Sequence, residues 1–129
     1  MSWIGAMYVV AGGAFGALCR YLSLEWVARY NLTGFPYGTF AVNILGSFLL
    51  GVWIAYAAHT LPPKMKDLHL LLAVGALGGF TTFSTFAWDT FDLLDRGAFV
   101  QTLIYVGGSV FLSVLALMGG MWFIRLLNA

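Results

Sequence analysis

Long apolar stretches dominate the chain, and three short polar segments separate them. Each stretch reaches the roughly 20 residues that a helix needs to cross a bilayer. The pattern predicts membrane-spanning helices at residues 3–22, 38–58, 68–94 and 98–126. No segment between them is long enough for a soluble domain. We therefore expect an all-α integral membrane protein, with one four-helix domain over residues 1–129.

The segments between the spans contain residues that favour turns. Residues 31–36 end in Pro36, which is suited to starting a helix. Residues 61–66 contain two prolines, and residues 95–97 are expected to form a tight turn. Because the number of spans is even, both termini are expected on the same side of the membrane.

Composition supports the membrane assignment. The chain is 61% hydrophobic and 9% charged, whereas soluble domains carry about 25% charged residues. The net charge is +1 without a basic cluster, which argues against a nucleic-acid partner. The single Cys19 cannot form an internal disulfide and is interpreted as an apolar filler.

Basic residues are balanced between the two predicted sides. One side carries Lys64, Lys66 and Arg125, and the other carries Arg20, Arg29 and Arg96. Since orientation normally follows a Lys/Arg excess on the cytoplasmic side, one hypothesis is that the chain inserts both ways and pairs as an antiparallel dimer. The alternative is a weak bias hidden by the uncertain helix ends.

Small size also favours pairing, because four short helices leave little room for a sheltered pathway. A symmetric dimer is the commonest oligomer and would build such a pathway at the subunit boundary. Gly12 and Gly16, and likewise Gly75 and Gly79, form GxxxG motifs that favour close helix contact. Dimerisation through either pair is one hypothesis for their role.

Polar residues form stripes on two of the spans. The second span carries Thr39, Asn43 and Ser47, and the fourth carries Thr102, Tyr105, Ser109 and Ser113. Spacings of three and four place each set on one helix face. Unsatisfied polar groups are costly in lipid, so these stripes face protein or water. They either bond neighbouring helices or line a pathway.

Ionisable residues are absent from the middle of every predicted span. A proton relay usually keeps such a group at membrane depth, and no catalytic constellation is present, so the chain is not expected to be an enzyme. A pathway here would be neutral, lined by hydroxyl, amide and aromatic groups. Such a lining can donate hydrogen bonds to an anion without a fixed carboxylate to repel it.

The third span contains the unusual sequence GALGGFTTFSTF at residues 75–86. Gly78 and Gly79 weaken a helix, and the hydroxyl residues that follow offer its backbone other hydrogen bonds. The sequence predicts a broken helix, whose carbonyls can bind a cation while half-helix N-termini favour anions. Phe83 and Phe86 share a face and present ring edges of partial positive charge. The alternative is glycine for packing and phenylalanine for bulk.

Three segments identify a family. GGFTTFSTF (78–86), GTFAVN (38–43) and GGAFGALCRY (12–21) resemble the Fluc-type fluoride channels of bacteria, also called CrcB proteins. The resemblance implies a passive, fluoride-selective channel that exports cytoplasmic fluoride across the bacterial plasma (inner) membrane. It also implies an antiparallel, dual-topology homodimer with two pores and a structural sodium ion at its centre.

The resemblance also implies roles for individual residues. The backbone carbonyls of Gly78 and Thr81 would hold sodium, and Arg20 would lie near an aqueous vestibule. The fluoride pathway would be lined by Asn43, Phe83, Ser84, Thr85, Phe86, Tyr105 and Ser109. We expect the hydrogen-bond donors among them to be Asn43, Ser84, Thr85 and Ser109. Phe80 stands where many relatives have Leu, and Asp89 stands where Glu is common.

Two other functions remain as alternatives. A small dual-topology multidrug exporter depends on a membrane-embedded glutamate in its first helix, but the first acidic residue here is Glu25, at the far end. A structural subunit of a larger membrane complex would use the polar stripes only to bond helices together.

Overall fold

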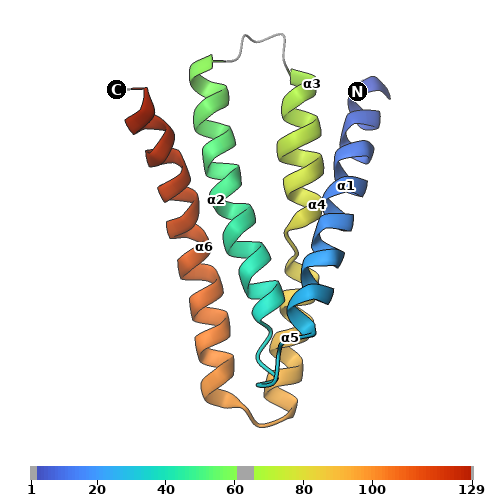
Figure 1. Cartoon of the computed structure of the whole chain (residues 1–129), viewed down its shortest axis with the longest axis vertical. Helices are drawn as coiled ribbons and strands as arrows, with labels where there is room; N and C mark the ends of the chain where they lie inside the picture. The colour runs from blue at the N-terminus through green and yellow to red at the C-terminus, as the bar shows by residue number, and fades with distance from the viewer. Residues whose placement is uncertain (1–2, 61–65, 129) are drawn as a thin grey trace.

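The computed structural model describes residues 3–60 and 66–128, and all regular structure in these ranges is helical (Figure 1). The elements are α1 (Trp3–Ala28), α2 (Tyr37–Thr60), α3 (Lys66–His69), η2 (Leu70–Leu77), α4 (Gly78–Phe80), α5 (Phe83–Asp95) and α6 (Phe99–Leu127). The elements from α3 to α5 follow one another as a single run. Together with α1, α2 and α6, this run gives four helices long and apolar enough to cross a membrane, as predicted.

The ends of the spans agree with the sequence in most places. The Pro36 carbonyl accepts the first helical bond of α2, from the Phe40 amide at 3.1 Å. Both ends of the described chain lie at the same end of the molecule, as expected (Figure 1). The predicted breaker at 61–66 lies outside the described residues except for Lys66. The first helix continues to Ala28 instead of ending near residue 22, so Arg20 lies inside it.

Glycines bring α1 against the third span. A Cβ on Gly12 would lie 2.8 Å from the Ala76 amide nitrogen, and one on Gly79 would lie 2.6 Å from the Gly13 carbonyl oxygen. Contacts this short need glycine because the neighbours are backbone atoms. Both GxxxG pairs are therefore used within the chain, and the hypothesis that either pair forms the dimer contact is wrong.

A second glycine contact joins α2 to α6. A Cβ on Gly51 would overlap the Leu117 carbonyl, and a Cβ on Gly120 would lie 2.9 Å from the Val52 amide nitrogen. The fold is thus two closely packed helix pairs, α1 with the third span and α2 with α6.

The third span is interrupted, as the sequence predicts. Thr81 (φ −80°, ψ 157°) and Thr82 (φ −150°, ψ 125°) are extended and separate α4 from α5. Gly78 and Gly79 remain helical, so the break follows the glycines instead of including them. The π-helix η2 was not predicted, because its sequence LLLAVGAL contains no polar residue and so gives no periodicity to read.

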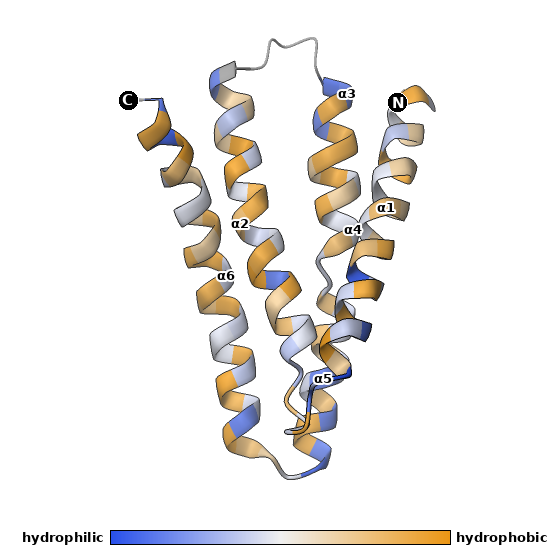
Figure 2. Cartoon of the chain, viewed as in Figure 1, coloured by the Kyte–Doolittle hydropathy of each residue, from blue (hydrophilic) through white to orange (hydrophobic). Residues whose placement is uncertain are grey.

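A small aromatic core lies at the end where the 29–36 loop meets the α5–α6 turn. Phe35, Leu93 and Tyr105 are buried there. Arg96 joins the two connections, donating to the Gly34 carbonyl at 3.1 Å and pairing with Asp92 at 2.8 Å. Many of the other large apolar side chains are exposed, and apolar residues run along the whole length of the spans (Figure 2), which suits a lipid environment.

Candidate functional site

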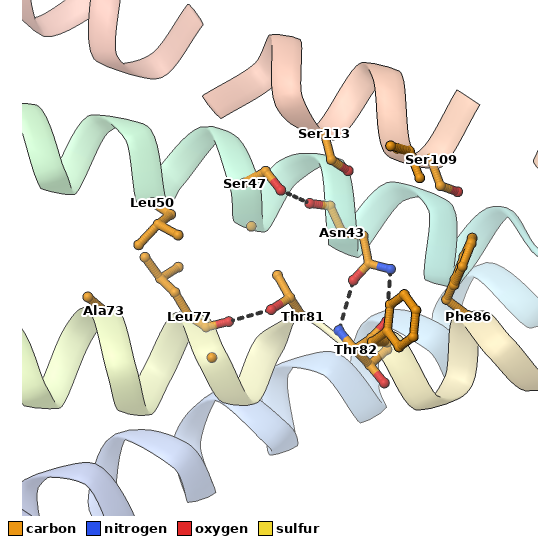
Figure 3. A pocket seen from close by; sticks show the side chains of 14 residues that line it. Asn43, Ser47, Leu50, Ala73, Leu77, Thr81, Thr82, Phe86, Ser109 and Ser113 are labelled. Atoms are coloured by element: carbon orange, nitrogen blue, oxygen red, sulfur yellow. Dashed lines mark hydrogen bonds between the residues drawn. The ribbon is translucent and has the colours of Figure 1, made fainter. Parts of the chain in front are cut away.

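A groove of about 450 Å³ lies beside the break, between α2, the third span and α6 (Figure 3). Its polar wall combines the stripes of α2 and α6 with the break. The residues that line it are Asn43, Gly46, Ser47, Leu50, Ala73, Leu77, Gly78, Thr81, Thr82, Phe83, Phe86, Ser109, Val110 and Ser113. The lining contains no charged side chain, so the groove is neutral, as the sequence predicts.

Asn43 connects α2 to the break. Its Oδ1 accepts from the Thr82 amide at 2.8 Å, and its Nδ2 donates to the Thr82 carbonyl at 3.0 Å (Figure 3). Both polar groups of this extended residue are therefore satisfied by one side chain. This matters in a membrane-spanning segment, where an unsatisfied backbone group is costly.

The break takes the usual helical donors away from several carbonyls, including those of Gly78 and Thr81. The Thr82 amide would bond to the Gly78 carbonyl in a continuous helix, but it bonds to Asn43 instead. The Thr85 amide would bond to the Thr81 carbonyl, but it bonds to the Thr82 hydroxyl at 3.2 Å. Gly78 and Thr81, the residues predicted to hold a cation, thus have carbonyls released from the helical pattern.

Thr82 caps the second half of the span. Besides accepting from the Thr85 amide, its hydroxyl contacts the hydroxyls of Thr85 at 3.1 Å and Ser84 at 3.3 Å. The first amides of α5 lie in this turn. A helix N-terminus carries a partial positive charge, so this end of α5 favours an anion.

Ser109 brings an unpaired hydroxyl to the groove. The side chain is only 5% exposed, and its Oγ has no hydrogen-bond partner in the described part of the chain. Figure 3 shows it on α6, at the same end of the groove as Phe86. Because a buried polar group without a partner is costly, this hydroxyl is suited to a ligand that accepts a hydrogen bond.

Aromatic rings form one wall. The ring centroids of Phe83 and Phe86 lie 5.4 Å apart, as their separation of three residues in the sequence predicts. The ring centroids of Phe86 and Tyr105 lie 5.2 Å apart. Tyr105 is fully buried and donates to Asp89 at 3.0 Å. Phe83 differs from both, because 79% of its surface is exposed and its own chain leaves the ring uncovered.

The structure brings most of the predicted site residues together. Six of them line the groove: Asn43, Gly78, Thr81, Phe83, Phe86 and Ser109. Ser84 and Thr85 lie outside the lining and bond to Thr82. Tyr105 stacks against the Phe86 ring.

Arg20 has a different position from the one expected at a helix end. Its Nη1 donates to the Thr81 carbonyl at 3.2 Å, so the guanidinium lies against the break. Arg20 therefore does not count among the basic residues of the loops. The loops on one side then carry two basic residues, Arg29 and Arg96, and the other side carries three. The difference of one is still a weak bias for the orientation of the chain.

Sequence reasoning missed two connections at the site. It assigned Thr82 no specific role, although this residue caps α5 and bonds to Asn43. It also named no partner for Asp89, which accepts a hydrogen bond from Tyr105. Threonine directly before the helical residues is a recognisable N-cap signal, but the Asp89 contact has no local signal because it joins different helices.

Side chains do not gather into a metal centre in the described ranges, which hold no group of three or more His, Cys, Asp or Glu residues. A cation bound here would rely on backbone oxygens, which suit hard cations. The released carbonyls of Gly78 and Thr81 fit that requirement.

Comparison with known proteins places the chain in a family. The family model for "CrcB-like protein, Camphor Resistance (CrcB)" matches residues 7–121. A fluoride-specific ion channel FluC from Rhizobium etli is 43% identical over 124 residues, covering 96% of this chain and 98% of the relative. The protein of the same name from Phenylobacterium zucineum is 45% identical over 119 residues, covering 92% and 94%.

These relatives are named as channels and not as enzymes, in agreement with the prediction that this chain is not an enzyme. Their bacterial sources and the four apolar helices agree with a multi-pass bacterial membrane protein. The chain belongs to the CrcB family, as its motifs indicate.

Proposed function

We propose that this protein is a passive, fluoride-selective ion channel that exports cytoplasmic fluoride. The observation that carries the proposal is the buried Ser109 hydroxyl, which has no partner in the described chain and faces a neutral groove. The names of the relatives support fluoride as the ion. Passive conduction agrees with the absence of charged side chains from the groove lining.

The groove can replace the water around a small, strongly hydrated anion. Ser109 supplies a hydroxyl from α6, and Thr82 lines the groove at the break, beside the N-terminus of α5. The Phe86 ring also lines the groove, and an aromatic ring edge carries partial positive charge. Weak donors of this kind allow an anion to enter and also to leave.

An antiparallel homodimer with two pores completes the proposal. The groove is open on one side, and the exposed Phe83 ring stands at that opening. A second copy would cover this ring and provide the missing wall of each pore. A two-fold axis makes two equivalent pores, and the weak charge bias of the loops is compatible with insertion in both directions.

A sodium ion at the dimer centre is the remaining part of the proposal. The Gly78 and Thr81 carbonyls of each subunit would hold it, and the ion would neutralise their partial charges where the subunits meet. Arg20 already donates to one of these carbonyls, whose two lone pairs can serve both partners. Sodium should therefore raise the melting temperature of the purified protein more than N-methylglucamine does. Equal melting in both salts would contradict the site.

The alternatives account for less of the structure. A proton-coupled multidrug exporter needs an acidic residue in its pathway, and the groove lining has none. A purely structural subunit leaves the unpaired Ser109 hydroxyl without a role.

Fluoride efflux from liposomes that contain the purified protein tests the proposal. Wild-type protein should release fluoride, and Ser109→Ala should slow the release. Ser23→Ala is a matched control, since the Ser23 hydroxyl lies outside the groove and already donates to the Cys19 carbonyl. Unchanged efflux in Ser109→Ala would remove this hydroxyl from the pathway.

A further inference from the structure

We propose that Asn43 is a positioning residue, whose amide holds the break in its extended form and thereby sets the direction of α5. The predicted role as a fluoride donor is then secondary. The loss of fluoride flux expected when Asn43 is replaced rests on the proposed channel function. The change expected in the backbone of the break does not.

The bonding pattern supports this role. A carboxamide presents one acceptor and one donor side by side, as a peptide group does. Asn43 uses both on the backbone of a single residue, Thr82, at 2.8 and 3.0 Å. The result resembles a pair of opposed residues in a β-ladder, with a side chain in place of the second strand. This pairing matches the extended backbone of Thr82.

Other residue types fit this position less well. An ionised aspartate lacks the donor for the Thr82 carbonyl, and serine offers a single polar atom. Glutamine is longer by one methylene, so its amide would reach past the Thr82 backbone. Asparagine therefore suits this contact through both its length and its donor–acceptor pair.

The surface of α2 next to Asn43 is shaped to receive the break. Gly46 lies three residues further along the same face. A Cβ there would overlap the Thr81 methyl group and lie 3.2 Å from the Phe80 ring. Asn43 thus binds the break while Gly46 provides space for it. Because Thr82 is only 7% exposed, removing the Asn43 amide would leave two buried backbone groups unpaired.

The contact reaches the groove through Thr82. This residue caps α5 and bonds to Ser84 and Thr85. Movement of Thr82 would therefore shift the first turn of α5, including the Phe83 and Phe86 rings. Asn43 acts on the pathway through this chain of contacts.

Hydrogen exchange at the Thr82 amide tests the proposal directly. Protein labelled with ¹⁵N-threonine and reconstituted in nanodiscs would be compared as wild type, Asn43→Ala and Ser109→Ala, with fluoride efflux measured on the same samples. We expect Asn43→Ala to speed exchange at Thr82 by about tenfold, the worth of one hydrogen bond, and to slow efflux. Ser109→Ala should slow efflux and leave Thr82 exchange unchanged.

Gly46→Ala gives a second measurement if Asn43→Ala does not fold. It leaves the Asn43 amide in place but pushes the break away from α2, so it should also speed exchange at Thr82. Slow efflux in Asn43→Ala with unchanged Thr82 exchange would overturn the proposal and return Asn43 to the role of an ion ligand. If wild-type protein releases no fluoride, the channel function fails, and the exchange result still decides the role of Asn43.

Discussion

Replacing Gly16 with alanine should separate α1 from the third span. A Cβ on Gly16 would overlap the Ala76 carbonyl and lie 2.8 Å from the Phe80 amide nitrogen. Both neighbours are backbone atoms that cannot rotate away, so the helices must move apart. Overpacking of this kind costs about 1–3 kcal/mol. Arg20 lies one helical turn after Gly16 in α1. Movement of α1 would therefore also draw Arg20 away from the Thr81 carbonyl.

Gly107→Ala is the matched control, because nothing lies within 4 Å of a Cβ at this position on α6. The control gains helix propensity, worth up to about 1 kcal/mol. Thermal unfolding of both variants would be measured in the same detergent. The melting temperature of Gly16→Ala should lie clearly below that of wild type, and that of Gly107→Ala should equal or exceed it. Equal melting temperatures for the two variants would refute the glycine contact between α1 and the third span.

Three further predictions concern the groove and the dimer. Phe86→Ile removes a ring edge without adding charge, so it should block fluoride efflux from liposomes while chemical crosslinking still captures the dimer; normal efflux would show that the ring is dispensable. Ser109→Ala removes a buried, unpaired hydroxyl and should leave the melting temperature unchanged or higher; a clear loss of stability would reveal a partner for this hydroxyl. Two lysines added to one loop should fix the orientation of the chain and abolish efflux until an oppositely fixed copy is co-expressed; full activity of one fixed form alone would contradict the antiparallel dimer.

Features with a local cause could be predicted from the sequence. Apolar length predicts the four spans, and the spacing of Phe83 and Phe86 predicts that their rings meet. The hydroxyl residues after Gly79 predict the break, because their side chains compete for the backbone within a few positions. The polar stripe containing Ser109 was correctly expected to face away from lipid, since Ser109 is buried.

Features that join distant segments could not be predicted. The GxxxG motifs favour close contact but do not identify the partner, which proved to be within the same chain. The predicted end of the first helix, at residue 22, was wrong. The amphipathic residues up to Ala28 resemble an interfacial loop in composition, although they continue the helix. The contact of Arg20 with the Thr81 carbonyl joins residues 61 positions apart and has no local signal.

Anion selectivity tests the central claim most directly. Liposomes containing the purified protein, loaded with either fluoride or chloride, would be diluted into medium without that anion and given a permeant counter-ion. Ion-selective electrodes then follow the release of each anion. A fluoride-selective channel should give fast fluoride efflux and no chloride efflux. Comparable efflux of both anions, or no fluoride efflux from well-folded protein, would contradict it.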